Sequence, residues 1–211
     1  YEQLQILSEA QTDNVAVLLR MADVAYMMEN YTAMSEVCDK ALHLDTSNLQ
    51  TYLYYAKACR GLGEPIRAVA VLSLAIKLRE DYYAARLLRG TILLENHLLD
   101  DAAQDADYLF THLEPNEDVL LLKARVLKAQ EKTKEAEQVY GMVIEVNPFS
   151  LDAYRERSEV RTILGDAAGA AEDEASIKEM GAEVPEPSEG IEQKIKEKMQ
   201  QLDPYKVFHN E

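Results

Sequence analysis

The chain repeats itself with a period of 34 residues. When the 211-residue sequence is aligned with itself at this offset, five consecutive units begin at Val15, Leu49, Tyr83, Glu117 and Leu151, with no insertion or deletion between them. Internal repeats of this length are typical of solenoids, in which each unit packs on its neighbours. The period therefore predicts a chain built by stacking one structural unit five times.

Each unit has small or apolar residues at fixed positions. Apolar residues recur at steps of three and four through both halves of a unit, which is the spacing of one buried face on a helix. Polar or glycine-containing pairs such as Gly63-Glu64 separate the halves. Small residues let two helices approach to ~8–10 Å, so each unit is predicted to be helix, turn, helix. The recurring residues are Ala22, Ala56, Gly90, Ala124 and Ser158 in the first half, and Met34, Ala68, Ala102, Ala136 and Ala170 in the second.

This pattern resembles the tetratricopeptide repeat family. The family's large residue early in the first helix appears as Leu18, Tyr52, Leu120 and Tyr154, and its proline at the end of the second helix appears as Pro148. The resemblance implies an all-α fold, a right-handed α-solenoid with units at residues 15–48, 49–82, 83–116, 117–150 and 151–184. Residues 1–14 resemble the second helix of a partial repeat. The departures from the pattern are Arg86 in the third unit, and Arg161 and Glu174 in the fifth.

A different composition follows the fifth unit. Residues 185–211 are predicted to be a proline-rich linker, a helix and a tail, because Pro185, Pro187 and Gly190 stop the preceding helix. The helix has one narrow apolar stripe formed by Ile191, Ile195, Met199 and Leu202. We expect it to cap the exposed face of the fifth unit, since solenoids need a solubilising end. The alternative is a free amphipathic helix for a partner or a membrane surface.

By the same resemblance, the first helices line the concave surface of the superhelix. Their inward-facing positions carry leucines with basic side chains at intervals, which suits a protein or peptide ligand with apolar anchors and some acidic residues. The predicted partner-binding residues are Leu19, Tyr26, Leu53, Tyr54, Lys57, Arg60, Leu87, Leu88, Leu94, Leu121, Leu122, Arg125 and Lys128. The alternative is that some of these leucines pack between units and that the basic side chains are only solvated.

One subclass of the family can be excluded by its pattern. Co-chaperone members hold the C-terminal carboxylates of heat-shock chaperones with lysine, asparagine and arginine at set places on three first helices. Those places hold Leu19, Asp23, Tyr54, Ala84 and Leu88 here, so the carboxylate clamp is absent. Binding of apolar client segments, as in other co-chaperone members, stays open.

Charge and composition restrict the partners and the compartment. Acidic residues outnumber basic ones 38 to 22, a net charge of -16, which repels phosphate backbones and argues against nucleic acid. No apolar run approaches the ~18 residues of a membrane span. We therefore expect a soluble protein, and two cysteines outside any scaffold pattern favour the cytoplasm. Because the sequence begins at Tyr1, an exported form with a cleaved signal is the alternative.

The sequence carries no motif for catalysis, a cofactor or a metal. The four histidines are scattered, no phosphate-binding glycine loop occurs, and Cys38 and Cys59 are expected to be buried small hydrophobes. The acidic run at residues 172–174 is expected to be a solvated helix face. We thus expect a non-catalytic scaffold or adaptor. The alternatives are a structural segment of a longer or self-assembling solenoid, joined through its N-terminal edge, and a regulatory domain of an enzyme encoded upstream.

Overall fold

The computed structural model describes residues 14–182, which form ten α-helices joined by short turns. No strand occurs in this part of the chain, so the predicted all-α solenoid is confirmed. The half-repeat at residues 1–14, apart from Asn14, and the linker, helix and tail at 185–211 lie outside the described residues. The helices are α2 (Val15–Met27), α3 (Tyr31–Leu44), α4 (Leu49–Gly61), α5 (Pro65–Leu78), α6 (Tyr83–Glu95), α7 (Leu99–His112), α8 (Glu117–Ala129), α9 (Thr133–Val146), α10 (Leu151–Leu164) and α11 (Ala167–Ala182).

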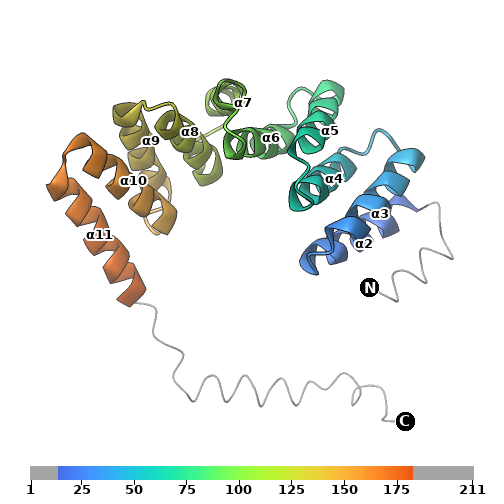
Figure 1. Ribbon diagram of the computed structural model, residues 1–211, viewed down its shortest axis with the longest axis horizontal. Coiled ribbons are helices and arrows are strands. Elements are labelled where there is room, and N and C mark those ends of the chain that lie inside the picture. The colour runs from blue at the N-terminus through green and yellow to red at the C-terminus, as the bar shows by residue number, and fades with distance from the viewer. Residues whose placement is uncertain (1–13, 183–211) are drawn as a thin grey trace, which may run out of the picture.

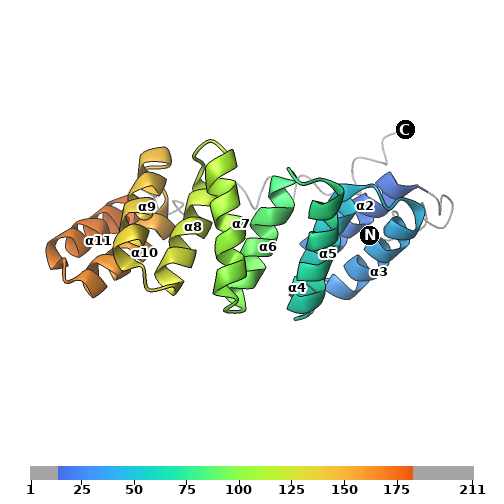
Figure 2. The same ribbon diagram turned by 90° about the horizontal axis from the view of Figure 1, so that it is seen from above.

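The helices stack in chain order into an open crescent (Figure 1). Each helix packs on the next one along the chain, and the first helices of adjacent units also contact one another: α2 with α4, α4 with α6, and α6 with α8. Helices α4 and α6 lie on the inner side of the crescent, whereas α5 and α7 lie on its outer side (Figure 1). Seen from above, the pairs follow one another along the long axis (Figure 2). The first helices therefore form the inner wall.

The ends of the helices recur with the same period as the packing. An asparagine or serine caps the first helix in four units, where the side chains of Asn14, Asn48, Asn116 and Ser150 accept a backbone N–H of the first turn. The third unit has Tyr82 at this place and has no side-chain cap. The turn between the two helices of every unit contains one residue with positive φ, and these residues are Glu29, Gly63, His97, Glu131 and Gly165.

The recurring small residues lie where the helices cross. Ala22, Ala56 and Ala124 have no exposed surface, and Met34, Ala68, Ala102 and Ala136 on the second helices are equally buried. The helices also approach closely at Gly90, where an added Cβ would lie 3.0 Å from Leu122 Cδ2 and 3.2 Å from Asp105 Cβ. A larger side chain there would push α6 away from α7 and α8, so close packing explains the glycine.

Two units have an ion pair where the others have valine. Asp105 on α7 is 1% exposed and accepts two hydrogen bonds of 2.7 Å from Arg89 on α6. Arg86, the departure in the third unit, lies 3.4 Å from the same carboxylate and stacks on the Tyr108 ring. The corresponding residues of the first, second and fourth units are Val37, Val71 and Val139, all of them buried.

The fifth unit repeats this arrangement and corrects one expectation. Asp173 is 1% exposed and is bound by Arg157 and Arg161. The prediction that the acidic run at residues 172–174 is a solvated helix face is therefore wrong for its central residue. The acidic composition of residues 172–174 gives no sign of this contact, because the partners lie 12 and 16 residues earlier on the preceding helix.

Candidate functional site

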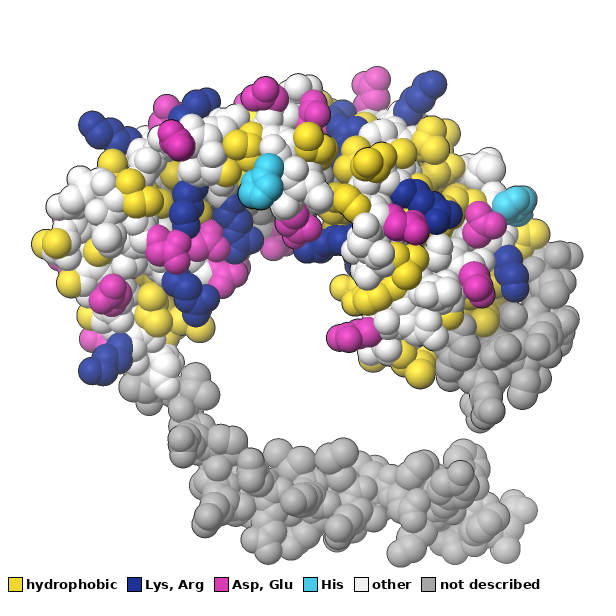
Figure 3. Space-filling view, in the orientation of Figure 1, with side chains coloured by type: hydrophobic (Ala, Val, Ile, Leu, Met, Phe, Trp, Pro, Cys, Tyr) yellow, Lys and Arg dark blue, Asp and Glu magenta, His cyan; other side chains and the backbone are white. Residues whose placement is uncertain are grey.

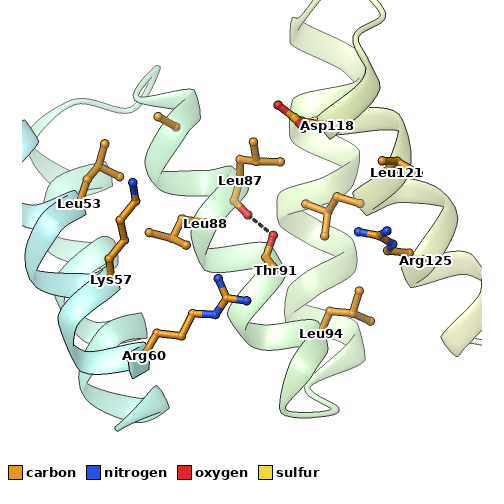
Figure 4. A pocket seen from close by; sticks show the side chains of 12 residues that line it. Leu53, Lys57, Arg60, Leu87, Leu88, Thr91, Leu94, Asp118, Leu121 and Arg125 are labelled. Carbon is orange, nitrogen blue, oxygen red and sulfur yellow. Dashed lines mark hydrogen bonds between the residues drawn. The ribbon is translucent and has the colours of Figure 1, made fainter. Parts of the chain in front are cut away.

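A hollow of about 390 Å³ opens on the inner wall between α4, α6 and α8 (Figure 4). It brings together nine of the predicted partner-binding residues, which are Leu53, Lys57, Arg60, Leu87, Leu88, Leu94, Leu121, Leu122 and Arg125. Ala84, Thr91 and Asp118 complete the lining. We call this hollow the inner pocket. Its volume is at the lower end of the ~300–1,000 Å³ of ligand sites, which suits a few side chains of a partner.

The floor of the inner pocket is apolar and comes mainly from α6. Leu87 and Leu88 are half-buried and project from α6 between the two neighbouring first helices, with Leu53 on the α4 side (Figure 4). Leu94 lies near the end of α6 and is also half-buried. Side chains of this kind remain reachable from the groove although they touch the core, which leaves an apolar surface available to a ligand.

The expected leucine ladder does not continue freely onto α8. Leu121 is 8% exposed and Leu122 is 4% exposed, so both are core residues that contribute only a small surface to the pocket. Leu122 packs against α6 at Gly90, whereas Leu121 belongs to the core that α8 forms with α9 and α10. The expectation that these two leucines are free is wrong, and the alternative, that they pack between units, applies to them.

Three of the four predicted basic side chains are already paired with carboxylates. Arg60 donates from Nε and Nη2 to the two carboxylate oxygens of Glu95, and the bond from Nε is 3.0 Å long. Arg125 donates to Glu156 at 2.6 and 2.9 Å and to Asp152 at 3.1 Å. The third pair joins Lys128 to Glu159. The prediction that all four cations are free to receive acidic groups of a ligand is therefore wrong.

These pairs connect the first helices of adjacent units. Hydrogen bonding to Glu156 raises the pKa of Arg125, so its guanidinium stays charged. Tyr140 also donates its hydroxyl to Glu156 at 2.8 Å, and burial, followed by the charge of Glu156, raises the pKa of Tyr140. Figure 3 shows the resulting mixture of acidic and basic side chains on the inner edge near α8 and α10.

Lys57 has a different environment from the other three cations. Its ammonium lies 5.1 Å from the centre of the Tyr26 ring and 5.7 Å from the centre of the Tyr54 ring. Tyr54 donates its hydroxyl to Asp23 at 3.2 Å, and burial, followed by the charge of Asp23, raises the pKa of Tyr54. Aromatic faces attract a cation without neutralising it, so Lys57 keeps its charge available to the pocket.

The remaining predicted residues lie outside the inner pocket. Leu19 is half-buried on α2, Tyr26 is 42% exposed at the end of α2, and Tyr54 lies on α4 beside Lys57. Lys128 on α8 is engaged by Glu159.

A spacing rule could have revealed the pairs that sequence analysis missed. Tyr54–Asp23, Arg125–Glu156 and Lys128–Glu159 all join residues 31 apart, and Arg89–Asp105 and Arg157–Asp173 join residues 16 apart. In a 34-residue repeat these are the separations of facing positions on neighbouring helices. No such signal singles out Asp118 or Ala84.

The described residues show no metal site. Within residues 14–182, no group of three or more His, Cys, Asp or Glu side chains is placed to hold a metal ion. Cys38 and Cys59 are buried free thiols, and burial raises the pKa of Cys38 to about 12. A buried, protonated thiol is a poor nucleophile and a poor ligand. In this part of the chain no helix is both long and apolar enough to cross a membrane.

Comparison with solved structures shows which proteins have a similar fold. The MamA protein of Desulfovibrio magneticus (residues 41 to its end) superposes with a TM-score of 0.75 at 13% identity, covering 82% of this chain and 97% of that one. YrrB, described as a tetratricopeptide repeat protein with an unusual peptide-binding site, gives 0.65 at 15% identity, covering 92% and 97%. A tetratricopeptide repeat protein of Parabacteroides merdae gives 0.71 at 20% identity, covering 82% and 68%. No protein-family model and no curated protein matches the sequence.

Proposed function

Because the chain has the tetratricopeptide repeat fold, we propose that it is a non-catalytic interaction scaffold that binds a segment of a partner protein in the concave groove. The inner pocket is the centre of this binding site. Half-buried leucines of α4 and α6 supply the apolar contact, and Lys57 supplies a free positive charge.

The observation that carries this proposal is the apolar pocket on the inner wall, which lies between the paired charges of Arg60 and Arg125. Leu53, Leu87, Leu88 and Leu94 converge on one hollow from two adjacent helices. An inner wall that served only to hold the solenoid together would be expected to close such a hollow, as Leu122 closes the gap at Gly90. The description of YrrB as having a peptide-binding site supports the same kind of ligand here.

A charged residue placed in the pocket tests the proposal without disturbing the core. Ala84 is exposed, lies in the first turn of α6 and lines the pocket, so Ala84→Glu puts a carboxylate among the leucines. A glutamate in the first turn of a helix is also compatible with the helix dipole. Ala70→Glu on the outer helix α5 is the matched control, because Ala70 is exposed and does not line the pocket.

The assay compares proteins that the immobilised full chain captures from the native extract, identified by mass spectrometry. We expect a set retained by the parent and by Ala70→Glu but lost by Ala84→Glu, with circular dichroism showing that all three fold. Equal capture by all three proteins would place the binding surface outside the inner pocket and refute the proposal.

A further inference from the structure

The pairing of charges on the inner wall leaves two charged groups of the pocket without an ionic partner. Of the four charged residues in its lining, Arg60 is bound by Glu95, and Arg125 is bound by Glu156 and Asp152. Lys57 and Asp118 remain, and among residues 14–182 neither forms an ion pair. These two side chains therefore dominate the charge that a ligand in the pocket meets.

Lys57 is held between aromatic rings, and Asp118 lies at a helix end that favours its charge. Lys57 lies over the Tyr26 and Tyr54 rings. Asp23, the carboxylate beside this cluster, accepts the Tyr54 hydroxyl and does not line the pocket. Asp118 is exposed in the first turn of α8, where the positive end of the helix dipole favours a carboxylate.

The two groups lie on opposite walls. Lys57 projects from α4 and Asp118 from α8, and the leucines of α6 lie between them (Figure 4). The pocket thus has a positive end, an apolar centre and a negative end. Complementary charges of this kind govern specificity and orientation more than affinity.

We propose that the inner pocket recognises an apolar anchor residue flanked by an acidic residue toward Lys57 and a basic residue toward Asp118, so that a bound segment lies in one direction. This inference rests on the proposed function of the groove. A segment in the reverse direction would place like charges against both walls, which is how interfaces reject wrong arrangements. The ligand then needs an acidic residue only at the position next to Lys57, because the other cations of the groove are paired.

Selection from a displayed library of random 12-residue peptides tests the proposal on the immobilised full chain. Peptides that also bind Ala84→Glu are removed first, so the remaining ones depend on the inner pocket. We expect apolar anchors with opposite charges on their two sides, and one order of acid and base in most sequences. Exchanging the two charges of an enriched peptide should weaken its binding by roughly two- to fivefold for each pair disrupted.

A charge-exchanged variant gives the sharpest result. Lys57→Glu combined with Asp118→Lys should select peptides with the opposite charge order. Lys134→Glu combined with Glu135→Lys is the matched control, since both residues are exposed on α9 outside the inner pocket and Glu135 also lies in a first turn. This control should select the same order as the parent.

The outcomes separate the two proposals. Apolar anchors without a preferred charge order, equal numbers of both orders, or an unchanged order with the charge-exchanged variant would each overturn the directional pocket while leaving the groove as a binding site. No enrichment over Ala84→Glu would instead overturn the proposed function itself. An order that inverts with the exchanged charges supports both.

Discussion

Replacing Asp105 by valine removes the buried acid of the third unit while leaving its guanidinium partners in place. Valine itself fits this position, since Val37, Val71 and Val139 occupy it in other units and are buried. The cost therefore comes from Arg89, whose side chain is 21% exposed and would lose both 2.7 Å hydrogen bonds. Removing one partner of a buried ion pair costs ~3–5 kcal/mol, and partial exposure of Arg89 places the expected loss near ~3 kcal/mol.

Urea unfolding followed by circular dichroism measures this loss, and two further variants interpret it. Asp107→Val, two residues along α7, removes an exposed acid paired with Lys123 and should cost less than ~1 kcal/mol. Arg89→Met combined with Asp105→Val reproduces the Met21 and Val37 pair of the first unit, and should recover at least ~2 kcal/mol of the loss. If Asp105→Val is as stable as the parent, or the double variant is no better than the single one, the reasoning about the orphaned cation is refuted.

Three further outcomes follow from the backbone, the packing and the buried thiols. Glu131 has a φ of 61°, so Glu131→Gly should raise the unfolding free energy by roughly 0.5–1 kcal/mol in urea titration, whereas Glu135→Gly inside α9 should lower it by a similar amount. Gly90→Val should cost roughly 1–3 kcal/mol, because it overfills the junction of α6, α7 and α8, and a neutral result would contradict that close approach. Folding raises the pKa of Cys38 from 9.0 to about 12, so its stabilisation is complete below pH 9 and is lost as pH rises toward 12. Between pH 8 and pH 10, deprotonation of this thiol should lower the unfolding free energy by about 1.4 kcal/mol. Cys38→Ala should remove this decrease, and an unchanged decrease would show that it does not come from Cys38.

The 34-residue period made the architecture predictable. The units predicted to begin at Val15, Leu49, Tyr83, Glu117 and Leu151 each begin with a helix at that residue. A solenoid is unusually open to such analysis, because its contacts are local and are repeated in every unit. The family resemblance placed the predicted partner-binding residues on the first helices, and nine of them line the inner pocket.

The charges of the site were not predicted in the same way. A basic residue read on its own helix face gives no sign of a carboxylate one unit away, and Arg60 and Arg125 are paired with such carboxylates. Only a comparison of positions 31 or 35 residues apart would have shown these two pairs. Burial of Leu122 depends on how closely α6 and α8 approach, and an added Cβ at Gly90 would lie 3.0 Å from Leu122 Cδ2. Leu121 is buried instead in the core that α8 forms with α9 and α10. These errors arise from contacts between helices, which the apolar spacing within one helix does not report.

The cross-unit pairs on the inner wall also bear on how the crescent bends. Tyr54–Asp23 joins α4 to α2, Arg60–Glu95 joins α4 to α6, and Arg125–Glu156 joins α8 to α10. Between α6 and α8, no hydrogen bond or ion pair connects the first helices within the described chain, and their contact is apolar, as at Leu122 and Gly90. The ion pair at this junction joins Lys123 on α8 to Asp107 on the outer helix α7. We therefore expect the curvature of the crescent to change most at the junction between α6 and α8, where no ionic contact links the first helices. The inner pocket spans this junction. Small-angle X-ray scattering at low and high salt should show little change in the radius of gyration if this apolar junction sets the curvature, because screening weakens ionic contacts and spares apolar ones.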